Sequence, residues 1–288
     1  MTRQPDPIRF GLIGVDSPHA PSFTRLFGDG RTGIVEGGTI TAAWQDQTDR
    51  AFPPSLRGPR HAMELAGTGV ELLGSPEEVV DAVDAVLIVA ADARRHPSLF
   101  DRVVTAGKPV YVDTRFATTR VDAERMLRRA ERTGALVLAG SPKRFTPEFR
   151  RARGLLDRVE RVRITGPLPV QPGLPGLHWY GVHLIDLAVA ALGSGFDEIS
   201  AHDDRFRLRW ADGRVADIGG PVEWGPETLG DLRDENDAEA AFRIVSEEPM
   251  LTGLLRALVA AVRTGVPTVP VEEILDIVTA TQRGSHRG

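Results

Sequence analysis

The sequence contains no cysteine, which excludes disulfide bonds, thiolate metal sites and a cysteine nucleophile. Long apolar runs are absent too: the longest, residues 85–91, is far too short to span a bilayer. Basic residues are not in excess, because the net charge is −5, and nothing therefore indicates a nucleic-acid partner. Residues 1–7 lack the apolar stretch of a signal peptide. We therefore expect a cytoplasmic protein without a membrane partner.

The chain does have enough length and apolar content for two domains, with 288 residues of which 41% are hydrophobic. Its first half alternates short apolar runs with helical patterns. We expect strands at 8–14, 39–45, 70–73, 85–90 and 136–140, a further buried strand that begins near 108 and ends at the turn of 113–115, and helices near 19–27, 60–68, 97–106 and 119–133, with one more starting at 76. This alternation predicts βαβ units and a Rossmann-like, doubly wound parallel sheet over residues 1–145.

Ligands of such sheets bind at the carboxyl ends of the strands. The predicted strand ends therefore define one candidate crevice, which is lined by Gly14 to His19, by Gln45 and Asp46, by Ala91 to His96, and by Asp113 to Arg115.

Residues 146–288 follow a different rhythm, in which strands outnumber helices. We expect strands at 159–164, 199–210, 214–218 and 240–245, helices at 178–192, 250–263 and 271–282, and a long acidic surface loop at 219–237. This pattern predicts an α+β domain with an open, mostly antiparallel sheet. An uncovered apolar sheet face is typical of a subunit interface, and we therefore expect a homodimer or homotetramer.

The first turn, Gly14-Val15-Asp16-Ser17-Pro18-His19, keeps only the first glycine of the dinucleotide-binding pattern. The amides at the helix start, with Ser17 and His19, are candidate ligands of a pyrophosphate. A carboxylate at Asp16 would repel that group unless it is bridged or turned away. The alternative is a scaffold that no longer binds a dinucleotide.

Asp46 follows the second predicted strand. An acidic residue there would bind the ribose hydroxyls of the adenosine and favour NAD over NADP. The alternative is a solvated loop residue.

Gly107-Lys108-Pro109-Val110, followed by Asp113, resembles the end of the fifth strand in the Gfo/Idh/MocA oxidoreductases, which usually reads Gly-Lys-x-Val-x-x-Glu-Lys-Pro. The resemblance places Asp113 at the Glu position, Thr114 at the lysine and Arg115 at the proline. In that family the lysine helps bind the nicotinamide and contacts the reacting hydroxyl. Thr114 has no charge to offer, and the Arg115 guanidinium cannot accept a proton.

Three further stretches support the resemblance. A subset of the family has a first turn similar to Gly14–His19. Ala91 to His96 matches a turn that packs under the nicotinamide ribose there, although a capping role for Asp92 or His96 is the plain alternative. Arg144 belongs to a stretch that matches the junction on the substrate side of the cleft, where a purely structural arginine is equally compatible with the pattern.

The stretch from His178 to Leu187 carries the remaining candidates. The family pattern here is Asp-x-x-x-His-x-x-Asp; His183 and Asp186 match it, and Trp179 replaces the first Asp. On one helix these three side chains would share a face. We expect His183 to act as acid/base with Asp186 orienting its ring, helped by Arg115, Tyr180 or His178. Trp179 and Tyr180 are candidates for stacking on a ring substrate, and the spacing of His178, His183 and Asp186 fits no metal signature.

The resemblance implies an oxidoreductase that uses NAD or NADP, with NAD slightly favoured, on the hydroxyl or carbonyl group of a sugar-like or cyclic small molecule. Two alternatives stay open because the lysine and the first Asp are missing. One is a non-redox or sensor protein on the same scaffold, and the other is a lyase or isomerase.

Overall fold

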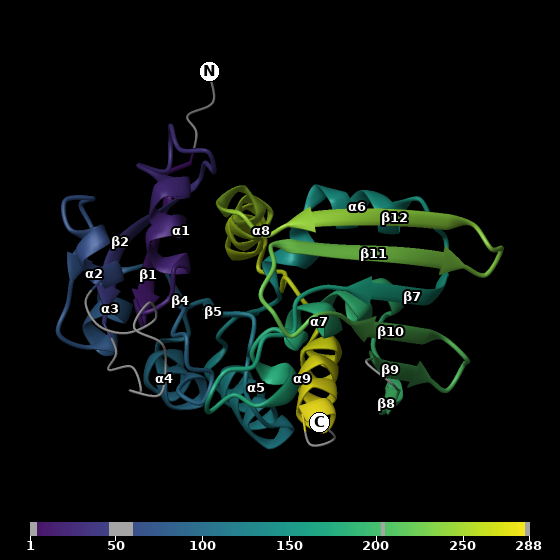
Figure 1. The fold of residues 1–288 in the computed structure, drawn as a ribbon. Helices are drawn as coiled ribbons and strands as arrows, with labels where there is room; N and C mark the ends of the chain where they lie inside the picture. Colours follow the sequence, from purple (N-terminus) through teal and green to yellow (C-terminus); the bar gives the residue numbers. More distant parts are fainter. Residues whose placement is uncertain (1–4, 46–59, 203–204, 286–288) are drawn as a thin grey trace. The chain divides into compact units, whose positions relative to one another are not determined.

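The computed structural model describes residues 5–45, 60–202 and 205–285 of the chain. The chain divides into two compact units, each assembled from separate stretches of sequence (Figure 1). The first unit consists of Met1–Asp113, Glu124–Ala139 and Leu255–Thr268, and the second of Thr114–Ala123, Gly140–Leu254 and Val269–Gly288. The domain boundary that the sequence indicates after residue 145 stays a prediction.

A six-stranded parallel sheet forms the first unit, in the order β3-β2-β1-β4-β5-β6. The strands are β1 (Ile8–Ile13), β2 (Gly38–Trp44), β3 (Glu71–Leu72), β4 (Ala85–Ile88), β5 (Val110–Val112) and β6 (Val137–Leu138). The helices are α1 (His19–Phe27), α2 (Arg60–Leu65), α3 (Pro76–Ala82), α4 (His96–Val103), α5 (Arg120–Thr133) and α8 (Leu251–Thr264), of which α5 and α8 also contain residues of the second unit. The predicted Rossmann-like sheet is confirmed, although β3 and β6 are shorter than expected.

The centre of this sheet is buried on both faces. Every residue of β4 is buried, and so are Phe10, Leu12 and Ile13 of β1, which is why these strands read as continuous apolar runs. The start of α3 also follows its sequence signal: Ser75 accepts the Glu78 amide, and its hydroxyl donates to the Glu78 carboxylate.

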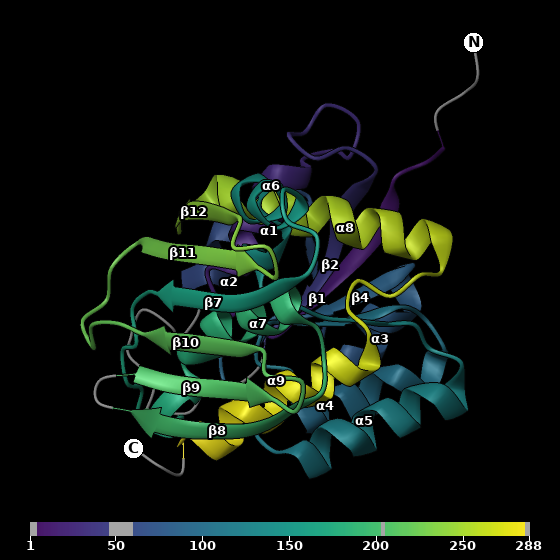
Figure 2. The same cartoon turned by 90° about the vertical axis from the view of Figure 1, so that its right-hand side faces the viewer.

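The second unit contains a mixed sheet in the order β12-β11-β7-β10-β9-β8, antiparallel except for the pair β7 and β10. Its strands are β7 (Val159–Thr165), β8 (Phe196–His202), β9 (Arg205–Trp210), β10 (Val215–Gly219), β11 (Glu227–Asp234) and β12 (Glu239–Val245). Helices α6 (Pro147–Gly154), α7 (Gly181–Leu192) and α9 (Val271–Ser285) pack against one face (Figure 2). The predicted open, mostly antiparallel sheet is confirmed.

Three local predictions in this unit were wrong. The single strand expected at 199–210 is two strands, β8 and β9. The loop expected at 219–237 contains β11, whose residues alternate between exposed and buried. Its glycine and acidic residues resemble a loop, but Gly230 is needed because a side chain there would clash with the Phe242 ring, 2.2 Å from the Cβ position.

The third correction concerns the helix expected at 178–192. A 3₁₀ turn, η4 (Gly176–His178), comes first, and α7 begins only at Gly181. Trp179 therefore precedes the helix and does not share its face with His183 and Asp186. The glycine at the start of α7 packs against Leu177, whose side chain lies 2.5 Å from where a Cβ would be.

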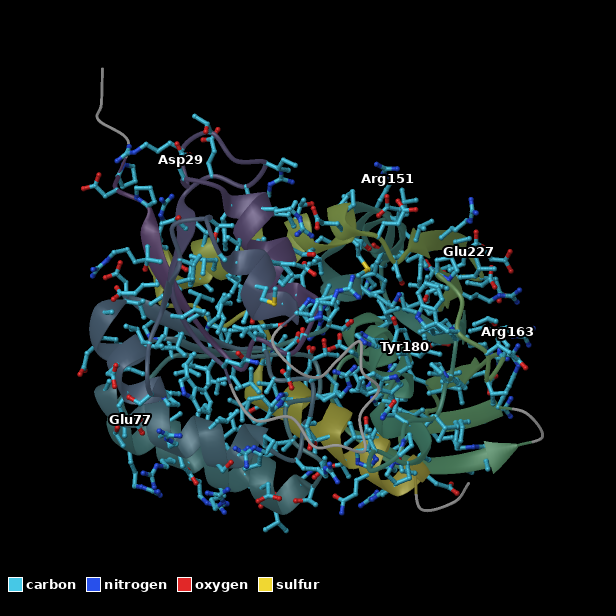
Figure 3. All side chains as sticks on the ribbon, turned by 60° about the vertical axis from the view of Figure 1, so that its left-hand side comes forward. Asp29, Glu77, Arg151, Arg163, Tyr180 and Glu227 are labelled. Carbon is cyan, nitrogen blue, oxygen red and sulfur yellow. The ribbon has the colours of Figure 1, made fainter. Side chains whose placement is uncertain are left out.

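The open face of the second sheet is uncovered but charged, not apolar as expected. Across its middle, the paired strands place Asp231, Arg163, Asp217 and Arg207 side by side, and Arg207 binds Asp217 through two hydrogen bonds of 2.6 and 2.9 Å. Figure 3 shows Arg163 at the outer surface of this unit. The apolar-face argument for self-association does not apply, and a homo-oligomer stays a prediction.

In the described part of the chain, no helix is both long enough and apolar enough to cross a membrane.

Candidate functional site

The first turn of the first unit depends on Gly14. Its φ angle is +80°, and a Cβ at this position would lie 2.6 Å from the Cβ of Ala90. Only glycine therefore lets the end of β1 pass so close to the end of β4. Val15, the next residue, is fully buried.

Asp16 is turned toward the end of β4. Its side chain is buried, and Oδ1 accepts a 3.0 Å hydrogen bond from the Ala91 amide. The carboxylate thus joins the turn after β1 to the turn after β4. The sequence predicts that this carboxylate repels a pyrophosphate unless it is turned away. The Asp16 carboxylate is instead bound by a backbone amide of the protein.

His19, the first residue of α1, reaches the end of β5. Its Nδ1 lies 2.8 Å from Oδ2 of Asp113, and the Tyr111 hydroxyl donates to Oδ1 of the same carboxylate at 2.9 Å. The ring also stacks on Phe23, and the His19 amide donates to Ser17 Oγ at 3.1 Å. The structure therefore brings together the ends of β1, β4 and β5, as the strand order predicted.

The other described cofactor candidates, Ala91 and His96, lie in the turn after β4. His96 is fully buried, with Nε2 2.8 Å from the Ala90 carbonyl oxygen. Asp92 accepts the Arg94 amide and pairs with the Arg94 guanidinium. These contacts favour the structural interpretation of this turn, in which Ala91 is bound by Asp16. Asp46 lies outside the described residues.

In the second unit, His183 projects from the first turn of α7. Its Nδ1 lies 2.7 Å from Oγ of Ser141, and its ring centroid is 5.0 Å from that of Tyr180. The Tyr180 hydroxyl in turn accepts a 3.2 Å hydrogen bond from Nε1 of Trp224, which is 59% exposed. A chain of contacts thus runs from the exposed Trp224 through Tyr180, which is labelled in Figure 3, to a buried serine.

Asp186 lies one turn further along α7 but does not contact the His183 ring. Its carboxylate accepts the Ser141 amide at 3.0 Å and pairs with Arg144 Nε at 3.2 Å. Burial raises the pKa of Asp186, and the Arg144 charge opposes this shift. Arg144 also pairs with Glu273. The expected orientation of His183 by Asp186 is therefore indirect, through Ser141, and the contacts of Arg144 favour its structural interpretation.

The turn after β5 contacts the segment before α7 through Arg115 and through Thr118. Arg115 lies 4.3 Å above the Trp179 ring and donates through Nε to the Trp179 carbonyl oxygen. The two ring nitrogens of His178 lie 3.1 Å from the Pro175 and 3.0 Å from the Thr118 carbonyl oxygen. Both ring nitrogens of His178 are thus within hydrogen-bonding distance of backbone carbonyl oxygens, which disfavours its predicted role as a substrate ligand. Thr114 is buried.

Three residues of this region were missed by the sequence analysis: Ser141, Lys143 and Trp224. Ser141 precedes Pro142 at the start of the 3₁₀ helix η3 (Pro142–Phe145), a recognisable cap signal, but its contact with His183 spans 42 positions and leaves no local trace. Lys143 is buried, donates to Ser246 Oγ at 2.6 Å, and has its pKa lowered to about 8 by desolvation. Within the described residues, no three His, Asp or Glu side chains are grouped as metal ligands.

Known proteins resemble this chain in sequence and in fold. No family model matches it. Two inositol 2-dehydrogenases of Cereibacter sphaeroides strains are 27% and 26% identical over 196 residues, which are 62% of this chain and 52% of theirs. The chain thus spans about half the length of these curated relatives.

The solved structures cover the whole fold. GenD2 from gentamicin A biosynthesis, in complex with NAD, matches with a TM-score of 0.77 at 15% identity, over 99% of this chain and 95% of its own. The myo-inositol 2-dehydrogenase of Lactobacillus plantarum matches with 0.74 at 15%, over 97% of each chain. KijD10, a 3-ketoreductase from Actinomadura kijaniata in complex with NADP and TDP-benzene, matches with 0.69 at 20%, over 98% of each.

The chain has the fold of the Gfo/Idh/MocA oxidoreductases. The resemblance read from its sequence is thereby confirmed. Thr114 and Trp179 stand where the family pattern has its lysine and its first Asp. The structure links these two positions, because the guanidinium group of Arg115, which follows Thr114 in the chain, lies over the face of the Trp179 ring.

Proposed function

We propose that the chain is an NAD(P)-dependent oxidoreductase of the Gfo/Idh/MocA type, acting on a hydroxyl or carbonyl group of a sugar-like or cyclic small molecule. The observation that carries the proposal is the junction of β1, β4 and β5. Asp16 and His19 tie three strand ends around the start of α1, through Ala91 and Asp113. This is where a parallel sheet binds ligands, and similar folds are solved with NAD or NADP.

The residues of this junction fit a dinucleotide. Residues 14–20 lead into the N-terminus of α1, which favours a pyrophosphate. The acidic side chain of the turn is engaged with Ala91. When bound, the nicotinamide supplies the hydride donor or acceptor. We assign cofactor binding to residues 1–145 and substrate binding to residues 146–288, with NAD slightly favoured because of Asp46.

On the substrate side, we assign contact with the reacting oxygen to His183. Thr114 and Arg115 occupy the turn where the family has its lysine. Arg115, which lies over the Trp179 ring, therefore provides a positive charge in this turn in place of the lysine. Tyr180, which packs on His183, offers an aromatic face to a ring substrate. Asp186 supports His183 through Ser141.

Calorimetric titration of the purified protein with NAD, NADH, NADP and NADPH tests the proposal. At least one dinucleotide should bind. Gly14→Ala should abolish this binding, because the added methyl group meets Ala90. Gly225→Ala is the matched control, since nothing lies within 4 Å of a Cβ there. If none of the four binds the wild type, the proposal is wrong and a non-redox role on this scaffold replaces it.

We also propose that the protein is cytoplasmic and forms a homodimer or homotetramer through the open face of the second sheet. That face carries acidic and basic side chains in adjacent positions, which favours contact with a second copy of itself. Light scattering at micromolar concentration measures the mass. A monomer at low salt would contradict the proposal.

A further inference from the structure

The hydroxyl group of Ser141 has few partners. Ser141 is fully buried, between β6 and η3. Its Oγ accepts the Lys143 amide at 3.3 Å and lies 2.7 Å from His183 Nδ1. Its own amide donates to Asp186 Oδ2. Two side chains of consecutive turns of α7, His183 and Asp186, thus hold the side chain and the backbone of the same serine.

This arrangement decides which ring nitrogen carries the proton. A hydroxyl group has one hydrogen to donate and two positions at which to accept. The Lys143 amide occupies one accepting position. Among the residues that the structure describes, the acceptor within reach of the Ser141 hydrogen is His183 Nδ1. If Nδ1 carried the proton, Oγ would accept twice and its own buried hydrogen would lack an acceptor, which is costly.

We infer that Ser141 holds neutral His183 as the Nε2–H tautomer, so that the imidazole offers a hydrogen-bond donor at Nε2 rather than a base. Ser141 is then a positioning residue, and Asp186 fixes Ser141 in place. For catalysis the inference rests on the proposed function. In carbonyl reduction the Nε2–H group stabilises the negative charge that hydride transfer leaves on the reacting oxygen, which the family lysine would otherwise do and Thr114 cannot, and solvent water then supplies the proton of the new hydroxyl group. In alcohol oxidation solvent water accepts that proton. This role replaces the acid/base role expected for His183.

Nitrogen-15 NMR of histidine-labelled protein tests the tautomer directly, without substrate or cofactor. The chain has seven histidines, and His183 is assigned as the signal pair missing from His183→Gln. At a pH where His183 is neutral, Nε2 should show the shift of a protonated nitrogen and Nδ1 that of a hydrogen-bonded acceptor. A protonated Nδ1 in the wild type would overturn the inference.

Ser141 variants test the cause. In Ser141→Ala, the Nδ1 signal should move to the position of an unbonded nitrogen, and Ser141→Thr should restore it. Thr146→Ala is the matched control: it removes the cap of α6, a few residues away, and should leave the His183 signals unchanged. An unchanged spectrum in a folded Ser141→Ala would overturn the inference. Because these spectra need no turnover, a missing dehydrogenase activity would refute the proposed function alone.

Discussion

Ser141 Oγ lies 2.7 Å from His183 Nδ1, and Asp186 reaches only the backbone amide of that serine. Asp186, which the sequence pattern assigns to orient His183, therefore orients Ser141, and Ser141 contacts the histidine. Burial raises the Asp186 pKa and Arg144 opposes that shift, so the carboxylate depends on its ion pair. Arg144 and Glu273 extend the same network on its far side.

Lys143 should limit stability near neutral pH. Burial lowers its pKa from 10.5 to about 8, and the unfolded chain therefore binds this proton more tightly. The charged form costs about 3 kcal/mol, offset by about 1 kcal/mol from its hydrogen bond with Ser246. We expect Lys143→Met to raise the free energy of unfolding at pH 7 by about 2 kcal/mol.

The difference in unfolding free energy between the wild type and Lys143→Met should depend on pH. The wild type should gain stability relative to Lys143→Met as pH rises from about 8 toward 10.5, because the folded state loses its proton first. Chemical unfolding at several pH values measures this difference. Lys108→Met is the control, since Lys108 donates to two backbone carbonyl oxygens and its loss should destabilise the protein. An advantage of Lys143→Met that is independent of pH would contradict the prediction.

Asp16 should support dinucleotide binding, not oppose it. A carboxylate that faced the phosphates would repel them, and Asp16→Gly would then tighten binding. Because Oδ1 instead accepts the Ala91 amide, we expect Asp16→Gly to weaken affinity about 10-fold or more through loss of a charged hydrogen bond. Asp16→Asn keeps an acceptor and should stay close to the wild type. Calorimetry decides, and tighter binding by Asp16→Gly would show that its charge is the obstacle.

Thr114→Lys should raise turnover about 10-fold or more if the rest of the pocket is intact, because the ammonium group stabilises charge on the reacting oxygen. Thr114 is buried, so Thr114→Met is the matched control for the added length. Steady-state rates with a cyclic polyol and the bound dinucleotide measure the effect. If the lysine variant loses activity while the methionine variant keeps it, the pocket serves another reaction, such as that of a lyase or isomerase.

Much of the fold could be predicted from the sequence because its signals are local. The capped start of α3 and the buried run of β4 are readable from adjacent residues. β11 was missed because its glycine and acidic residues acquire their meaning only beside β12 and β7, where Gly230 makes room for Phe242.

The candidate site was predictable in residue types but not in connections. His19 was correctly expected near Asp113, and the turn at Gly14 near the end of β4, because the strand order brings these strand ends together. The pairing of Ser141 with His183 depends on how α7 packs beside η3. No spacing within the sequence encodes that contact.

A comparison of His183→Gln with His183→Ala in a dehydrogenase assay tests the donor role of His183 most directly. The glutamine amide carries N–H groups near the place of Nε2–H but cannot act as a base. If His183 acts as a donor through Nε2–H, His183→Ala should lower kcat about 10²–10³-fold, His183→Gln should recover most of this loss, and both variants should bind the dinucleotide as the wild type does. Equal loss in the two variants would contradict the donor role, and full activity in His183→Ala would show that the histidine is structural.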